Sequence, residues 1–192
     1  MSRDGSNGTP GRRGYFAIGA ERLSKSLNLG NLMRSAHGFG ASFTFTIGAR
    51  YQALEAAADT SKGAQHLPHY NWGSLAEMVL PQGCKLVGVE LIEGAIDLPS
   101  FHHPRRAAYI LGPERGSLSP EVLARCDWVV RIPTAFSINV AMAGAVVMYD
   151  RARTLGRFAP RPLIEGGPIN TGPADALSEP VWVAAKERIK RG

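Results

Sequence analysis

Short apolar runs alternate with amphipathic or alanine-rich segments along most of the chain. The apolar runs are typical of strands, which we predict at Tyr15–Ile18, Ser42–Ile47, Lys85–Leu91, Ala107–Leu111 and Trp128–Ile132. The intervening segments predict helices at Asn28–Gly40, Gln52–Asp59, Ser74–Leu80, Ser119–Arg125 and Val140–Arg153. Alternating strands and helices indicate an α/β domain over residues 15–155, with a mainly parallel sheet and helices on both of its faces.

Local patterns make some of these elements more specific. Ser42–Ile47 alternates polar and apolar residues with period two, so we expect a strand with one buried face. Ser74, with Glu77 three residues later, forms a capping-box pattern. Ser119, followed by proline, is typical of a helix start. Val140–Arg153 carries Ala, Met and Val on several sides, and we expect this helix to be buried.

The two ends of the chain lack this periodicity. Residues 1–14 are rich in Gly, Ser and Arg, and we expect a disordered basic arm. Residues 156–192 are predicted to be a Pro- and Gly-rich tail that ends in a short basic helix at Val181–Arg191. The 192 residues carry a formal net charge of +6. Such a charge attracts polyanions, either nucleic acid or an anionic membrane surface.

The sequence lacks the residues that several functional classes of protein require. Cys84 and Cys126 form no C-x-x-C pair, which argues against a disulfide scaffold and fits a reducing cytoplasm. No Cys or carboxylate completes a zinc set with the histidine pairs at 66/69 and 102/103, so we expect no metal. No run approaches the roughly 20 apolar residues that span a bilayer. The glycine motifs of nicotinamide enzymes and of triphosphate hydrolases, and the serine hydrolase elbow, do not occur.

The first segment with candidate chemistry runs from Asn28 to Gly40. It places Arg34 within a helix whose start is rich in Asn and Gly. Free amides at a helix start favour an anion, and an arginine adds a bidentate phosphate clamp. The alternative is an ordinary capped helix with a surface arginine.

Two further segments follow predicted strands, and ligands bind at the carboxyl ends of strands in open parallel sheets. In the second segment a Gly112-Pro turn leads to Glu114, where glycine allows close approach of a ligand. In the third, a strand stops at Pro133, and a helix begins at Ser137 or Asn139. A tight turn and a simple helix cap are the alternatives.

Taken together and in this order, the three segments resemble the SpoU/TrmH-type RNA ribose 2′-O-methyltransferases of the SPOUT class. The matching motifs are N-x-G-x-x-x-R from Asn28, LGPE-x-G from Leu111, and IP…S-I-N-V-A from Ile132. The resemblance implies a deep C-terminal trefoil knot, S-adenosyl-L-methionine as the cofactor, and a homodimer with its active sites near the interface. The implied substrate is a ribose 2′-hydroxyl in structured RNA.

The resemblance also implies the site residues. The catalytic set is Arg34, Asn28, Glu114, Ser137 and Asn139. The cofactor-binding set is Val89, Glu90, Leu111, Gly112, Gly116, Ile132, Pro133 and Ile138. Arg34 matches the family's catalytic arginine, as either a general base or a phosphate clamp. The clamp needs no shift of the guanidinium pKa, which lies above about 12. The other four residues of the catalytic set are assigned to holding Arg34, the loops and the ribose.

Two departures from the family refine the expectation. Ile138 stands where leucine is commonest, a mild apolar change. The first motif begins near residue 28, so we expect the minimal form without a preceding RNA-binding domain, which favours tRNA over ribosomal RNA. The expected RNA contacts are basic residues, namely Arg12, Arg13, Lys25, Lys62, Arg105, Arg106, Arg115 and those of the C-terminal segment. A catalytically inactive knotted RNA-binding or assembly factor, and a methyltransferase acting on a base or a protein, are the alternatives.

Overall fold

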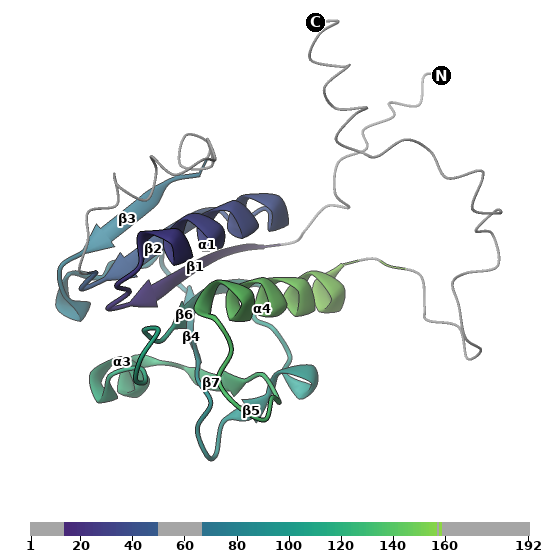
Figure 1. The fold of residues 1–192 in the computed structure, drawn as a ribbon. Coiled ribbons are helices and arrows are strands. Elements are labelled where there is room, and N and C mark those ends of the chain that lie inside the picture. Colours follow the sequence, from purple (N-terminus) through teal and green to yellow (C-terminus); the bar gives the residue numbers. More distant parts are fainter. Residues whose placement is uncertain (1–13, 50–66, 157, 159–192) are drawn as a thin grey trace, which may run out of the picture. The chain divides into compact units, whose positions relative to one another are not determined.

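A twisted sheet of parallel strands organises the protein (Figure 1). The computed structural model describes residues 14–49, 67–156 and 158. The sheet formed by these residues has seven strands in the order β3-β2-β1-β6-β4-β7-β5. The strands are β1 (Tyr15–Glu21), β2 (Phe43–Ile47), β3 (His69–Trp72), β4 (Lys85–Val89), β5 (Ile96–Asp97), β6 (Arg106–Leu111) and β7 (Trp128–Arg131). Their parallel pairing places all carboxyl ends at one edge.

Helices pack on both faces of the sheet, as predicted. The helices are α1 (Ser26–Phe39), α3 (Pro120–Arg125) and α4 (Val140–Leu155), with 3-10 turns η2 (Leu75–Glu77) and η3 (Leu98–Ser100). Side chains of α1 and α4 share one apolar core with one face of the sheet, while α3 packs into a second core on the other face. Gly144 permits the close contact of α4 with α1, because a Cβ there would lie 2.4 Å from Leu32 Cδ1. The predicted α/β class is confirmed.

The predicted strand at Ser42–Ile47 is present, but its expected polar face is buried. All five residues of β2 are buried. Thr44 and Thr46 tolerate burial because their hydroxyls hydrogen-bond to side chains of β3, with Thr44 Oγ1 2.9 Å from His69 Nδ1 and Thr46 Oγ1 2.9 Å from Asn71 Oδ1. Alternation therefore predicted the strand but not that both of its faces are buried.

The predicted helix at Ser74–Leu80 is wrong, since only the single turn η2 forms. Ser74 does not cap a backbone amide. Its hydroxyl instead donates to the Glu77 carboxylate at 3.0 Å, and that carboxylate accepts from the Gly73 amide at 3.0 Å. The capping-box pattern is satisfied by this local turn, and Pro81 follows too soon for a longer helix. The strands β3 and β5 were not predicted. The segment Gln52–Asp59 and both chain ends, residues 1–13 and 159–192, lie outside the described residues.

The helix α4 is only half buried, which corrects the expectation of full burial. Val140, Val147 and Met148 belong to the core. Met142, Val146 and Tyr149 share the opposite face and are 63%, 39% and 58% exposed. None of the described helices is sufficiently long and apolar to span a bilayer.

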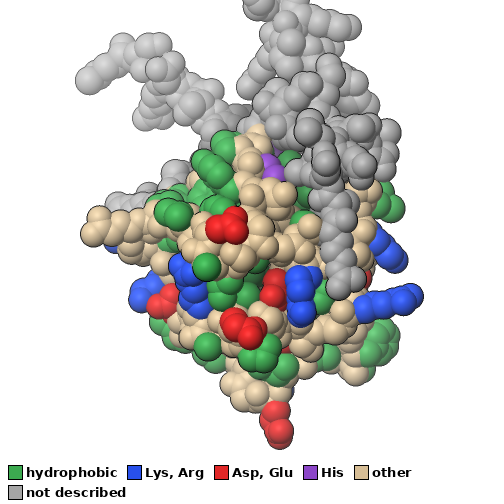
Figure 2. All heavy atoms as spheres, turned by 90° about the vertical axis from the view of Figure 1, so that its left-hand side faces the viewer, with side chains coloured by type: hydrophobic (Ala, Val, Ile, Leu, Met, Phe, Trp, Pro, Cys, Tyr) green, Lys and Arg blue, Asp and Glu red, His purple; other side chains and the backbone are tan. Residues whose placement is uncertain are grey.

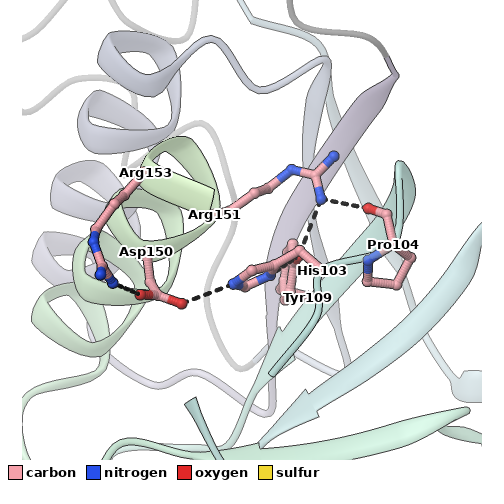
Figure 3. A network of polar contacts seen from close by, with 6 residues as sticks. All are labelled: His103, Pro104, Tyr109, Asp150, Arg151 and Arg153. Carbon is pink, nitrogen blue, oxygen red and sulfur yellow. Dashed lines mark hydrogen bonds and ion pairs between the residues drawn. The ribbon is translucent and has the colours of Figure 1, made fainter. Parts of the chain in front are cut away.

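A buried polar network attaches α4 to the segment that leads into β6 (Figure 3). The Arg151 guanidinium, 5% exposed, donates to the carbonyls of Pro104 and Arg105 and to the hydroxyl of Tyr109. His103 lies between Tyr109 Oη at 2.6 Å and the Asp150 carboxylate at 3.0 Å. Burial lowers the pKa of His103, although Asp150 opposes the shift, and burial raises the pKa of Tyr109 to about 12. The charged groups of the network are therefore the Arg151 guanidinium and the Asp150 carboxylate.

We predict that Arg151→Met lowers the free energy of unfolding by about 3 kcal/mol or more, because it leaves several buried acceptors without a donor. Urea denaturation followed by circular dichroism measures this change. Arg153→Met is the matched control. Arg153 lies on the same helix, but its side chain is 47% exposed and its ion pair with Asp150 is long, at 3.5 Å. Its loss should lower the free energy of unfolding by at most about 0.5–1 kcal/mol. Equal effects of the two substitutions contradict the assignment.

Candidate active site

A cavity of about 480 Å³ lies at the carboxyl ends of β4, β6 and β7, beside the first turn of α1. Most of the residues predicted for the site line it, namely Asn28, Val89, Glu90, Leu111, Gly112, Glu114, Gly116, Ile132, Ser137, Ile138 and Asn139. Pro133 and Arg34 are not among the lining residues. The three motifs, far apart in the sequence, therefore meet at one cavity.

Figure 2 shows the face of the molecule toward which the arrowheads of β1 and β3 point in Figure 1. Basic and acidic side chains are interspersed on it. The charge of this face is therefore mixed, and its chemistry depends on which carboxylates are already engaged by hydrogen bonds.

Glu114 connects the second motif to the start of α1. Its Oε1 accepts hydrogen bonds from the Lys25 amide at 3.0 Å and from Asn28 Nδ2 at 2.9 Å. Its Oε2 accepts from the amide and the hydroxyl of Ser24, each at 3.0 Å. Burial raises the pKa of Glu114, but the hydrogen bonds from Asn28 and Ser24 outweigh burial, so the pKa lies below its usual value. Glu114 is therefore an ionised anchor.

Asn28 also forms a hydrogen bond to the third motif. While its Nδ2 donates to Glu114, its Oδ1 accepts from Asn139 Nδ2 at 3.0 Å. The Oδ1 of Asn139 accepts from the Ala141 and Met142 amides and thereby caps α4. A continuous chain of hydrogen bonds, Glu114–Asn28–Asn139, therefore joins one residue from each motif. We refer to it below as the motif relay.

Glu90 and Gly112 line the cavity where β4 and β6 end. The Glu90 carboxylate accepts from the Leu118 amide at 2.8 Å and from the Leu91 amide at 3.0 Å. A Cβ on Gly112 would lie 2.9 Å from Glu90 Oε2 and 3.2 Å from the Leu118 nitrogen. Glycine is required here because the chain passes directly over the Glu90 carboxylate.

Arg34 is the predicted site residue that lies apart from the others. Its side chain is exposed on α1, and within the described part of the chain it makes no hydrogen bond or ion pair. The buried residues of α1 are Asn28, Leu29, Leu32, Met33 and Ala36, and helical periodicity places Arg34 opposite to them. The relay residues therefore hold the loops and not Arg34, contrary to part of the role expected of them.

Several residues that line the cavity or hold one of its loops were not predicted as site residues. Lys25 and Arg115 line it, although they were expected only to contact RNA. Thr134 also lines it, and its hydroxyl donates to the Phe136 carbonyl at 2.9 Å. Glu21, which is 5% exposed, accepts from the Ser119 amide at 2.7 Å. A charged residue that directly ends an apolar strand was the available signal for Glu21.

We predict that Glu114→Gln lowers the free energy of unfolding by about 1–3 kcal/mol, because the new amide group faces donors and leaves them without an acceptor. Chemical denaturation measures the loss. Glu93→Gln is the matched control, since Glu93 is exposed and makes no hydrogen bond within the described residues. We expect it to change stability by less than about 0.5 kcal/mol. A Glu114→Gln protein as stable as this control contradicts the anchor role.

Comparisons with known proteins agree on one family. Residues 15–149 match the SpoU rRNA Methylase family. A tRNA (guanosine(18)-2′-O)-methyltransferase of Escherichia coli (strain K12) is 25% identical over 148 residues, which are 74% of this chain and 65% of that protein. The Mus musculus tRNA (guanosine(18)-2′-O)-methyltransferase TARBP1 is 26% identical over 153 residues, 73% of this chain and 10% of that protein.

Solved structures show the same fold. The SpoU methyltransferase AviRb from Streptomyces viridochromogenes, in complex with AdoMet, superposes with a TM-score of 0.67 at 25% identity, covering 82% of this chain and 64% of that one. An rRNA methyltransferase from Sinorhizobium meliloti gives a TM-score of 0.67 at 22% identity, covering 78% and 59%. The chain thus spans somewhat less than two thirds of the bacterial relatives described here. By its sequence match and its fold, the chain belongs to the SpoU rRNA Methylase family.

Proposed function

We propose that the protein transfers a methyl group from S-adenosyl-L-methionine to a ribose 2′-hydroxyl of a structured RNA, with tRNA as the favoured RNA. The observation that carries this proposal is the motif relay, which gathers three family motifs around one cavity. The relatives that act on tRNA and the AviRb structure that contains AdoMet support it. The two cysteines are thiols, which fits a reducing cytoplasm as the place of action.

The cavity suits the methyl donor in size. Ligand pockets usually measure roughly 300–1,000 Å³, and this cavity has about 480 Å³ with a mainly polar lining that includes several apolar side chains. Leu111, Ile132 and Ile138 offer apolar walls for an adenine ring. Gly112 leaves backbone accessible where a Cβ has no room. When bound, the donor supplies an electrophilic methyl group.

The protein's part in the reaction is to place the acceptor hydroxyl and to steady the RNA backbone. Positioning alone contributes several kcal/mol to lowering a barrier. Lys25 and Arg115 line the cavity and attract phosphate. Arg34 serves as a bidentate phosphate clamp, because its exposed guanidinium presents a fork of N–H donors that matches a phosphate.

A homodimer places Arg34 in the active site. Leu27 is 58% exposed and shares the outer face of α1 with Arg34, seven residues later. The exposed face of α4, Met142, Val146 and Tyr149, is apolar as well. A two-fold interface that covers these faces brings Arg34 to the partner's surface, although Arg34 does not line the cavity of its own protomer.

The strand order favours a knotted chain. Only residues 90–95 separate β4 from β5, yet β7 pairs with both and lies between them. The segment 90–105 therefore loops across β7. Helix α4, which follows β7, is bonded through Arg151 to Pro104 and Arg105 of that same loop. In this proposal the C-terminal part of the chain passes through the loop.

We predict that Arg34→Ala retains donor binding in calorimetry but reduces methyl transfer at least about a hundredfold, since loss of a charged contact costs about 2–4 kcal/mol. The assay incubates the dimer with labelled donor and total tRNA or ribosomal RNA, followed by nucleoside analysis. Arg34→Lys should keep part of the activity, because a clamp needs a cation. Near-normal activity of Arg34→Ala overturns the clamp, and base-methylated products overturn ribose as the acceptor.

We predict that Val146→Glu dissociates the dimer, because it buries a charge in an apolar interface. Light scattering measures the mass of the particle, and methyl transfer should fall together with dimerisation. Val79→Glu is the matched control, since Val79 is 76% exposed and lies beyond η2, outside α1 and α4. A wild-type protein that is an active monomer is the outcome that rejects this interface.

A further inference from the structure

Two consecutive side chains at the end of β1 form hydrogen bonds to the backbone of the β6–α3 loop, close to the start of α3. Glu21, which is 5% exposed, accepts from the Ser119 amide at 2.7 Å. Arg22 Nη2 donates to the Ser117 carbonyl at 3.0 Å. The two side chains also pair with each other at 3.6 Å. They therefore act on this loop as one unit.

The backbone of Arg22 is held in an unfavourable conformation. Its φ is +48°, the one positive value among the described non-glycine residues. Only glycine adopts this region without a steric penalty. The amide of Arg22 donates to the Ile47 carbonyl at 2.7 Å, which fixes the conformation. Because a non-glycine residue is unfavourable at this φ, the presence of arginine suggests that its side chain has a role.

The loop is thereby fastened at three consecutive residues. The Ser117 carbonyl is held by Arg22, the Leu118 amide by Glu90 at 2.8 Å, and the Ser119 amide by Glu21. The near end of the same loop is fixed by Glu114 of the motif relay. The part between these anchors comprises Arg115 and Gly116, which line the cavity. The anchors at both ends therefore set the shape of this wall.

We propose that Glu21 and Arg22 are positioning residues that shape the donor pocket through Ser117 and Ser119. The inference rests on the proposed function, since it assumes that the cavity holds the methyl donor. Neither side chain needs to contact the donor, because each one holds the backbone of the loop that lines the donor pocket. Their loss is expected to weaken donor binding and to leave the chemical step intact.

The decisive variant is Arg22→Gly. Glycine accepts the positive φ, so the midpoint of thermal unfolding should stay equal or rise, while the bond to the Ser117 carbonyl is lost. Calorimetric titration with S-adenosylhomocysteine should show a Kd about tenfold higher than that of the wild-type dimer, the effect of one charge-assisted hydrogen bond. At saturating donor, kcat should stay within about twofold and KM for RNA should not change.

Three further variants complete the test. Glu21→Gln keeps an oxygen that accepts from the Ser119 amide, so its donor Kd should rise less than that of Glu21→Ala. Glu121→Gln is the control, because this exposed carboxylate lies beside Glu21 and Arg22 but holds no part of the loop. Its donor Kd should match the wild-type value.

The outcomes separate the two proposals. If the wild-type protein binds donor and Arg22→Gly binds it equally well, the positioning role is wrong and the proposed function stands. A lower kcat with an unchanged donor Kd also rejects the positioning role. If the wild-type protein itself binds no donor, the proposed function fails first, and the inference that rests on it fails with it.

Discussion

The carboxylate of Glu114 is the contact on which the site depends. It accepts four hydrogen bonds from Ser24, Lys25 and Asn28, so it satisfies the chain just before and within the first turn of α1. The start of this helix has no acidic side chain of its own, and Lys25 caps it without a side-chain bond. A carboxylate from the β6–α3 loop stabilises the amide end of the helix dipole instead. Helix formation and loop position are therefore coupled.

Parallel pairing explains why such a coupling is possible. Residues that are about 90 positions apart in the chain, such as Ser24 and Glu114, meet because β1 and β6 are adjacent and end at the same edge. The relay then continues to Asn139, 111 positions from Asn28. Asn28, the central residue of this chain, is buried, and both its amide nitrogen and its amide oxygen have partners, as a buried polar group requires. The three motifs are thus held to one another by side-chain hydrogen bonds.

The sequence pattern predicts elements whose own residues carry the signal. The apolar runs at β1, β4, β6 and β7 and the caps at Ser119 and Asn139 are of this kind. The failures have a common cause, which is that tertiary contacts decided the outcome. Strand β3 reads His-Tyr-Asn-Trp and becomes a strand by pairing with β2. The turn at Ser74 satisfies its own capping pattern locally, and no periodicity reveals that Arg151 will be buried.

The same reasoning applies to the site. The candidate site residues were predicted through the family resemblance, and eleven of these thirteen line one cavity in the structure. Glu21 and Arg22 belong to no quoted motif, and their role follows only from distances to Ser117 and Ser119. Arg34 lies on the face of α1 opposite the buried residues of this helix, and it does not line the cavity of its own protomer. An exposed arginine beside an exposed leucine on one helix face acquires a defined position only when another surface covers that face. In the proposed dimer the exposed apolar face of α4 supplies such a surface, since Met142, Val146 and Tyr149 lie together on it.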